Sequence, residues 1–508
     1  MSRIAGFVWM GAGLLLSGCA VGPNFTTPDA PGVPTFQRSS SAPGGGDAVP
    51  GRVMLRGADI PAQWWELFRS QSLNVVVREG LTRNADLAAA HAAVRVAQAN
   101  ARAQRGSLFP VIGAGFDASR HQIPTGTLNS DVVTEASRYS LHTGQVTVSF
   151  VPDVWGGSRR QIESVDAQAE MQAFQREGVS LTLASNIALA AIEEARLRGQ
   201  LSAVRDIVGL QTQLLNSLKR QNEQGQIAMP DVVAQEAAVA QARLLVPQIE
   251  KQLRQQENLI AFLTGRLPSE PALGSFRLNS FVLPRRLPLS LPADLVRQRP
   301  DIRAAEANLR AANAQVGVAI ANRLPQITLT ANPGSTSTAI GQLFTPGTGF
   351  WTIAGSLAQT VFDAGTLENR QRAAEEATVQ AAEQYRSTVL AAFQNVADVL
   401  GALQADARAI TAAATAEKSA RQYLDLMRRQ LDQGQVNVAV LLTSQQAVLQ
   451  SSLARVDAEA ARLADTVALF QALGGGWWNA QNDNGLTGGV SGRPVSNPSA
   501  TGRSGKAI

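Results

Sequence analysis

The chain has one cysteine in 508 residues, few aromatic residues and little net charge. A single cysteine excludes an intramolecular disulfide framework, so Cys19 needs another explanation. Aromatic residues make up only 5% of the chain, while alanine and leucine are abundant, a balance typical of long packed helices rather than a thick globular core. The formal charge of +5 comes from 45 Lys and Arg against 40 Asp and Glu, interspersed along helical stretches. A nucleic-acid-binding surface would cluster its basic residues, so we predict solvated helix faces and no nucleic-acid partner.

Motifs for catalysis and metal binding are also missing. The three histidines, His91, His121 and His142, have no Glu or Cys at ligand spacing and are interpreted as surface residues. No GxSxG, P-loop or GxGxxG occurs in a strand–turn–helix setting, and the glycine run 474–476 follows a helix as its cap. We therefore expect that the protein is not an enzyme and that it binds no metal and no cofactor other than a covalent lipid.

We expect this lipid because the amino-terminal segment has the pattern of an export signal. Arg3 precedes an apolar run, residues 4–16, that is too short to span a bilayer and predicts a cleaved signal. The sequence Leu-Ser-Gly before Cys19 resembles the bacterial lipobox, in which this cysteine becomes the lipidated first residue. Ala20 stands where an aspartate would retain a lipoprotein at the inner membrane, so the resemblance implies the outer membrane. The alternative is a buried thiol behind an ordinary signal peptide.

Long stretches without proline dominate the rest of the chain. Residues 366–432 contain no proline and almost no glycine, and one helix of this length would extend about 100 Å at ~1.5 Å per residue. A second such stretch runs from about residue 158 to residue 223. Apolar residues at alternating spacings of four and three predict one packing seam along each helix, as in a coiled coil. The seam residues are Leu197, Leu201, Val204, Val208, Leu215 and Leu218 in one stretch, and Val389, Phe393, Val396, Leu400, Leu403, Ala407 and Ile410 in the other.

Four short segments have a period of two. Apolar and small or polar residues alternate in 111–118, 145–150, 327–332 and 351–357, which predicts strands with one apolar face. Their length suits membrane strands rather than membrane helices. Four strands cannot close a barrel, because about eight is the smallest number found, and open edges leave backbone groups unpaired in hydrocarbon. The barrel must therefore be shared between copies, and a three-fold ring would give twelve strands and a matching helical tube.

The chain also repeats itself. The segments QGQIAMPDVV and QGQVNVAVLL begin 209 residues apart, and the same shift relates Gly156 to Gly365 and Gly265 to Gly474. This predicts an internal duplication in which each half is helix, strand, strand, very long helix, tight turn and return helix. The expected divisions are a signal peptide (1–18), a lipidated extended strap (19–60), a first repeat (61–265), an equatorial connector (266–298), a second repeat (299–474) and a flexible tail (475–508).

Four motifs carry a family resemblance that covers residues 19–477. They are CAVGPNF, RPDIRAAEANLRAANAQVGVAIANRLPQITLTA, VFDAGTLENR at a strand-to-helix joint, and FQALGGGW. Together they resemble the outer membrane factor family, the TolC-like channels, and within it the lipoprotein branch of RND efflux pumps. The resemblance implies a mainly α chain with a β-barrel portion, in a homotrimer whose twelve-stranded outer-membrane β-barrel continues into a periplasmic α-helical barrel. The implied partners are a periplasmic membrane-fusion adaptor, an RND inner-membrane transporter and outer-membrane lipid.

Under this resemblance the two helix breaks are the periplasmic tips, which would contact the adaptor. Each break needs a glycine in the left-handed conformation to reverse the chain between antiparallel helices. The tip residues are Gln224, Gly225 and Gln226 in the first repeat, and Gln433, Gly434 and Gln435 in the second.

The sequence departs from the family pattern at the expected gate. The family carries an acidic residue shortly after the second tip and a basic residue three positions on, and these positions are Thr443 and Gln446 here. A ring of aspartates would attract cations and repel itself across the axis, whereas a ring of Thr443 would do neither. We therefore expect weaker cation selectivity and a gate closed by packing and neutral hydrogen bonds. Asp231, after the first tip, is the nearest remaining carboxylate and is our candidate to face the pore.

The expected function is a passive outer-membrane exit duct of a tripartite efflux pump for small molecules such as drugs. Two alternatives remain open: a type I protein-secretion duct, and a periplasm-spanning structural lipoprotein without a pore. The lipobox and the RPDIRAAEA segment favour the drug-efflux branch by resemblance. Conductance in planar bilayers would separate either duct from the structural lipoprotein.

Overall fold

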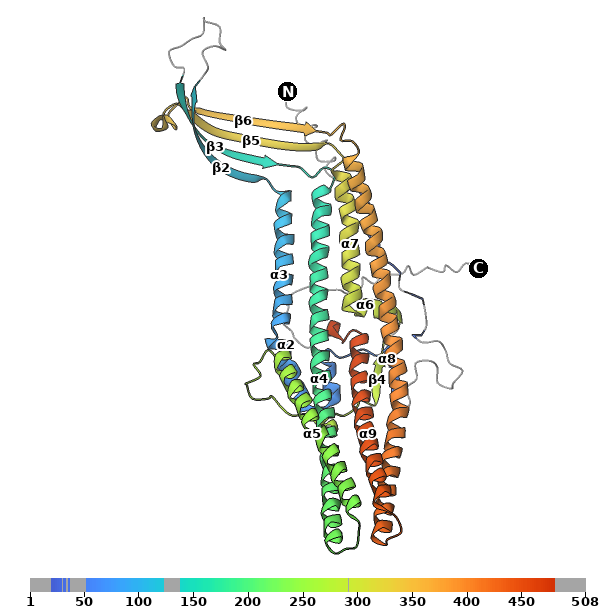
Figure 1. Cartoon of the computed structure of the whole chain (residues 1–508). Helices are drawn as coiled ribbons and strands as arrows, with labels where there is room; N and C mark the ends of the chain where they lie inside the picture. The colour runs from blue at the N-terminus through green and yellow to red at the C-terminus, as the bar shows by residue number, and fades with distance from the viewer. Residues whose placement is uncertain are drawn as a thin grey trace, which may run out of the picture.

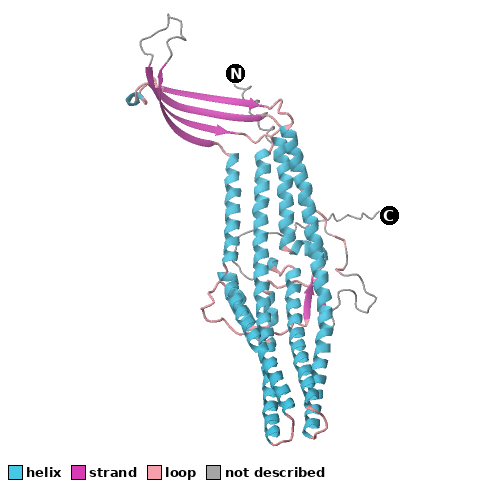
Figure 2. Ribbon diagram, viewed as in Figure 1, coloured by secondary structure: helices cyan, strands magenta, loops and turns pink. Residues whose placement is uncertain are grey.

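The molecule is elongated, with a sheet at one end, a row of helices below it and two helical hairpins at the other end (Figure 1). The computed structural model describes residues 20–29, 31–32, 35–36, 52–122, 138–290 and 292–479. The predicted signal peptide, Cys19 and most of the predicted tail lie outside the described residues. Among the described residues helix dominates, and strand is confined to the curved sheet and one short pair at mid-height (Figure 2). A mainly α fold with a smaller β portion is therefore confirmed.

The helices divide into two sets, one for each repeat, whose longest members match in length. The helices are α2 (Gln71–Arg83), α3 (Ala85–Arg105), α4 (Gly157–Glu223), α5 (Met229–Leu263), α6 (Pro292–Gln298), α7 (Pro300–Ala321), α8 (Thr366–Asp432) and α9 (Val438–Ala472). Both α4 and α8 have 67 residues, and both α5 and α9 have 35. The equal lengths confirm the internal duplication. Over the described residues, no helix combines the length and apolarity needed to cross a membrane.

Both long helices begin in the same way. Gly156 and Gly365 precede α4 and α8 with φ of 78° and 84°, a left-handed conformation that glycine adopts without strain. An aspartate a few residues earlier accepts backbone N–H groups of each first turn: Asp153 from Ser158 at 2.9 Å, and Asp363 from Leu367 at 2.8 Å. A carboxylate at a helix amino terminus satisfies orphan donors and complements the helix dipole. These hydrogen bonds fix the residue at which each long helix begins after the preceding strand.

The main sheet contains four antiparallel strands in the order β2–β3–β5–β6. Its strands are β2 (Val111–Gln122), β3 (Arg138–Phe150), β5 (Gln326–Ser337) and β6 (Gly349–Ala358). Each repeat supplies one hairpin, and β3 of the first repeat pairs with β5 of the second. The predicted strands are confirmed, with β2 and β6 left as the two edges.

Below the sheet, α3, α4, α7 and α8 stand side by side, with α4 against α7 in the middle (Figure 1). At mid-height the core is aromatic, where Trp64 of a short 3₁₀ helix stacks on Phe470 of α9 with ring centroids 5.4 Å apart. The predicted seam is buried at Val396, Leu400 and Leu403 of α8 and at most of its α4 positions, while Ala407 and Ile410 are only half-buried.

The connector contains elements that were not predicted from the sequence, among them helix α6 and a short strand. Strand β4 (Arg286–Leu289) pairs in parallel with β1 (Val53–Arg56) at mid-height. The proline-rich composition of this region hid the strand, because Pro288 lies within it and prolines are confined to sheet edges. The pair ties the start of the chain to the segment between the two repeats.

Candidate functional site

The first hairpin tip is a tight reversal at Gly225, which has φ of 70°. Its N–H donates to the carbonyl of Asn222 at 2.9 Å, and the N–H of Gln226 donates to the carbonyl of Gln221 at 2.8 Å. This pair of bonds closes α4 with a left-handed glycine in the Schellman pattern. Gln224, Gly225 and Gln226 are all exposed, so the whole turn faces solvent in the single chain.

The second tip reproduces the first. Gly434 has φ of 71°, its N–H donates to the carbonyl of Leu431 at 2.9 Å, and that of Gln435 donates to Gln430 at 2.8 Å. Gln433 closes α8 as Gln224 closes α4. The left-handed glycines predicted at both turns are therefore present, and two turns of one shape stand at the same end of the molecule (Figure 1).

A small apolar cluster behind the tips joins the two hairpins. It contains side chains from α4, α5 and α9, so it crosses from the first repeat to the second. The buried members are Leu215, Leu218, Val232, Val239 and Val438. Burial of apolar area stabilises this contact and holds the tips together within one chain.

The predicted gate residues lie just beyond the tips. Thr443 and Gln446 are exposed on one side of α9, about one helical turn apart, and the hydroxyl of Thr443 donates to the carbonyl of Ala439 at 3.0 Å. Asp231 is half-buried in the first turn of α5, on the other hairpin. The structure thus brings Thr443 and Gln446 together and places Asp231 on a separate element.

A set of buried amides that was not predicted from the sequence lies next to the predicted gate. Gln445 is fully buried, and among the described residues neither its amide nitrogen nor its amide oxygen has a hydrogen-bond partner. Gln235 of α5 is also fully buried and donates to the backbone carbonyl of Gln211 at 3.0 Å. Counting in steps of three and four from Leu441 would have placed Gln445 on the buried face. An unpaired buried amide costs about 1–3 kcal/mol, so this helix contact is less stable than an apolar one.

A carboxylate pair higher in the second hairpin was missed as well. Burial, together with the neighbouring Asp465 of α9, raises the pKa of Asp406 on α8 to about 7, while Arg462 opposes the shift. One carboxylate oxygen of Asp406 is buried without a hydrogen-bond partner among the described residues. At the equivalent position the first repeat carries the buried Leu197. The pair is therefore a feature of the second repeat alone.

Hydrogen bonds and ion pairs around Glu417 hold the lower part of α8 to α9. Glu417 accepts a hydrogen bond from Arg421 at 2.8 Å and from Ser452 at 2.7 Å, and forms an ion pair with Arg455. Burial opposes ionisation of Glu417, but these partners outweigh burial and keep its pKa below the usual value. The second hairpin is thus held by paired charges where the first repeat has Val208 in place of Glu417.

The residues after Cys19 pack against the joint between sheet and helices. The N–H of Val21 donates to the carbonyl of Trp155 at 3.0 Å, and the buried Arg160 donates to Val21 at 3.1 Å and to Asn24 at 2.8 Å. Gly22 has φ of 94°, and a Cβ there would lie 2.5 Å from the Cα of Gly317. This close approach requires glycine and fixes the strap beside the sheet.

Known proteins are similar in sequence to this chain over most of its length. The model of the outer membrane efflux protein family matches residues 76–266 and 291–475, which together cover most of the chain. The chain belongs to this family. This outer membrane efflux protein is 30% identical to the pyoverdine export outer membrane protein OpmQ of Pseudomonas putida over 82% of its length and 89% of the relative. It is 27% identical to the probable efflux pump outer membrane protein TtgC of P. putida, over 91% and 94% of the two chains.

Solved structures have the same fold. The outer-membrane channel OprN superposes with a TM-score of 0.82 at 25% identity, over 90% of this chain and 100% of that one. The CmeC channel of Campylobacter jejuni gives 0.82 at 20% identity, over 90% and 95%. The predicted family and channel fold are therefore confirmed. The prediction that the protein is no enzyme is confirmed by its family as well, since a channel passes solutes without changing them.

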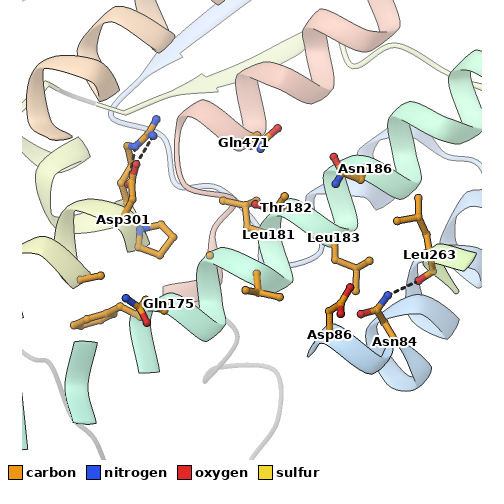
Figure 3. A pocket seen from close by; sticks show the side chains of 16 residues that line it. Asn84, Asp86, Gln175, Leu181, Thr182, Leu183, Asn186, Leu263, Asp301 and Gln471 are labelled. Carbon is orange, nitrogen blue, oxygen red and sulfur yellow. Dashed lines mark hydrogen bonds and ion pairs between the residues drawn. The ribbon is translucent and has the colours of Figure 1, made fainter. Parts of the chain in front are cut away.

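One cavity of about 700 Å³ opens at mid-height of this efflux protein, between α4 and the start of α7. Figure 3 shows Asp301 in an ion pair at one wall and Asn84 donating to the carbonyl of Leu263 at the other. These polar groups are occupied by contacts within the chain. Within the described ranges, no group of three or more His, Cys, Asp or Glu could hold a metal ion.

Proposed function

We propose that this efflux protein is the outer-membrane exit duct of a tripartite pump and passes small molecules such as drugs passively. The observation that carries the proposal is a four-stranded sheet with exposed apolar side chains and two free edges, joined directly to helices that end in two tips. A sheet in lipid must close, and one chain supplies too few strands. A homotrimer supplies twelve, and its long helices continue the bore across the periplasm. Relatives named for antibiotic and toluene efflux support small-molecule cargo.

The proposed partners dock at the far end. The two tips have one shape, are exposed, and would recur three times around a trimer, which supplies a ring of six similar turns for a periplasmic adaptor. The adaptor in turn connects the duct to an RND inner-membrane transporter, which supplies the energy. In the wall behind the tips, Thr443 and Gln446 form the neutral gate and Asp231 is the accompanying carboxylate.

The lipid anchor is proposed at Cys19. Its support is the position of Ala20, the next residue, which lies against Gly156 where the sheet meets α4. An acyl chain attached one residue earlier would enter the membrane beside the barrel, and one or a few chains anchor a protein without spanning the bilayer. Expression with labelled palmitate should label the wild type and leave Cys19→Ala unlabelled. Equal labelling of both proteins would exclude this anchor.

Two measurements test the duct itself. Purified protein should give discrete conductance steps in planar bilayers, and a deletion strain should become hypersusceptible to several unrelated antibiotics. A protein that spans the periplasm without conducting would instead be a structural lipoprotein. Loss of a secreted protein without hypersusceptibility would point to a type I secretion duct.

A further inference from the structure

One face of the sheet is apolar over most of its length and becomes basic at the end away from the helices. Alternate residues of a strand share a face, and Phe116 of β2 is paired with Gly144 of β3 on the apolar one. Continuing outward on this face, β2 carries Arg120 and β3 carries Arg138, and both arginines are exposed. Asp117, the one acidic residue of these four strands, lies on the opposite face. The described strands therefore place no carboxylate beside the two arginines.

The two arginines are close enough to bind one anionic group together. Arg120 is paired with Ser140, and Arg138 with Gln122, so the arginines are diagonal neighbours on adjacent strands, about 7–8 Å apart. Nε of Arg138 donates to the amide oxygen of Gln122 at 3.1 Å. This bond uses one of the five N–H donors of the guanidinium group and leaves the planar pair of terminal nitrogens for a ligand.

The loop between β5 and β6, residues 338–348, folds back over the same face at the end of the sheet away from the helices (Figure 1). A Cβ at Gly144 would lie 3.5 Å from Cδ2 of Leu343, so the leucine covers the face to which Gly144 belongs. The hydroxyl of Thr348 donates to the carbonyl of Leu343 at 2.8 Å, and the hydroxyl of Ser335 donates to the same carbonyl from the strand. These contacts hold the loop against the apolar face.

The loop nevertheless directs large apolar side chains away from the protein. Phe344 is 85% exposed and Ile340 is 64% exposed. Residues 338–348 contain no charged side chain. Trp351 of β6, on the same face of the sheet, is exposed as well. Exposed apolar side chains on an ordered, uncharged loop indicate a contact with an apolar partner, and aromatic residues of this kind border the apolar band of membrane β-barrels.

The order of these features along the face matches an amphiphile. Leu343 lies at the level of Gly144 and therefore of its partner Phe116. Arg120 is four residues farther out on β2, about 13 Å at ~3.3 Å per residue. An apolar band and an apolar loop are thus followed, at the outer end, by two cationic groups.

We propose that Arg120 and Arg138, together with the loop 338–348, bind an anionic, phosphate-bearing lipid of the outer leaflet. This inference rests on the proposed outer-membrane duct and names the chemistry of one lipid partner. The acyl chains lie against the loop and the apolar band, and the phosphate accepts hydrogen bonds from the two guanidinium groups, which suit phosphate in a bidentate geometry. A soluble anion would use the arginines alone and would leave the apolar loop without a role.

Lipid binding by the purified full-length protein in neutral detergent tests the site. The probes are lipid A, which carries anionic phosphates, and phosphatidylcholine, whose phosphate is balanced by a cation, and native mass spectrometry counts the lipids retained. Arg120→Gln with Arg138→Gln should weaken binding of lipid A by at least about tenfold and leave phosphatidylcholine unchanged. Arg254→Gln with Arg408→Gln removes the same charge from exposed positions on α5 and α8, and should bind lipid A like the wild type. Equal binding of lipid A by both double variants would overturn the proposal.

A second pair of substitutions tests the loop. Ile340→Ser with Phe344→Ser should weaken binding of both lipids several-fold, because the acyl chains lose an apolar contact. The two side chains are exposed, so their replacement leaves the packing of Leu343 intact. Unchanged lipid binding in this variant, or complete displacement of lipid A by millimolar inorganic phosphate, would show a simple anion site and overturn the lipid.

Conductance separates this site from the duct. The arginine and loop variants should conduct in planar bilayers like the wild type, which also shows that they fold and assemble. A conducting wild type without preference for lipid A would overturn the lipid site alone. A wild type that retains lipid A in the arginine-dependent manner but does not conduct would support the site and overturn the proposed duct.

Discussion

Among single residues, Asp406 gives the clearest dependence on pH. Its pKa is raised to about 7, whereas an unfolded aspartate has a pKa of about 3.9, so the native state binds more protons between these two values. Stability therefore falls as pH rises from about 4 to 7 and stays low above that range. Asp406→Asn removes the buried charge, and its melting temperature should exceed that of the wild type at pH 8 and vary less with pH.

The control for this prediction is Asp398→Asn, an exposed position on the same helix. Its melting temperature should follow the wild-type curve across the pH range. A steeper dependence on pH in Asp406→Asn than in the wild type would contradict the argument, because the neutral side chain has no proton to lose.

Gln445 provides the second prediction at this scale. Its amide is fully buried with no partner among the described residues, so Gln445→Leu replaces a desolvated polar group by an apolar one of similar size. We expect about 1–3 kcal/mol of added stability, measured by denaturant unfolding in detergent. Gln446→Leu, on the exposed side of the same turn, should change stability by less than about 0.5 kcal/mol. A loss of stability in Gln445→Leu would show that the amide makes a favourable contact in the assembled protein.

At the scale of elements, the two tips depend on glycine. Gly225 and Gly434 have φ near +70°, where a Cβ is strained although neither position meets another atom within 4 Å. Alanine at either position should destabilise its hairpin by about 1–2 kcal/mol. Gly209→Ala is the matched control, because this glycine lies within α4 with open space around it and alanine favours helix there by about 1 kcal/mol. Thermal unfolding should therefore shift in opposite directions, and a stabilised Gly434→Ala would contradict the assigned turn.

The elements also show what the sequence could and could not predict. The long helices, four strands and two tips were predictable, because period, proline content and glycine position are local signals repeated in both halves. Strand β4 was not, because its pairing with β1 joins residues more than 200 positions apart and its proline argues against a strand. The pairs at Asp406 and Glu417 were also missed, because helical spacing identifies a face but not the side chain opposite it.

At the scale of the whole molecule, the neutral gate predicts how the assembled channel selects ions. Thr443 and Gln446 are exposed on α9 beyond the second tip, and in a trimer each would form a ring of three uncharged side chains. Such a ring concentrates neither cations nor anions, whereas three carboxylates in a narrow pore attract cations. Thr443→Asp should therefore raise the cation-to-anion permeability ratio in planar bilayers several-fold, and less so at high salt because the added charges are screened.

Thr443→Asn, of similar size but uncharged, is the control and should keep the wild-type ratio. Asp231 is tested in the same recordings, since its removal in Asp231→Ala lowers cation preference only if this carboxylate faces the pore. An unchanged ratio in Asp231→Ala would remove that residue from the pore wall. If Thr443→Asp left selectivity unaltered while the wild type conducted, position 443 would lie outside the constriction, and the narrowest ring would have to be sought elsewhere on α9 or α5.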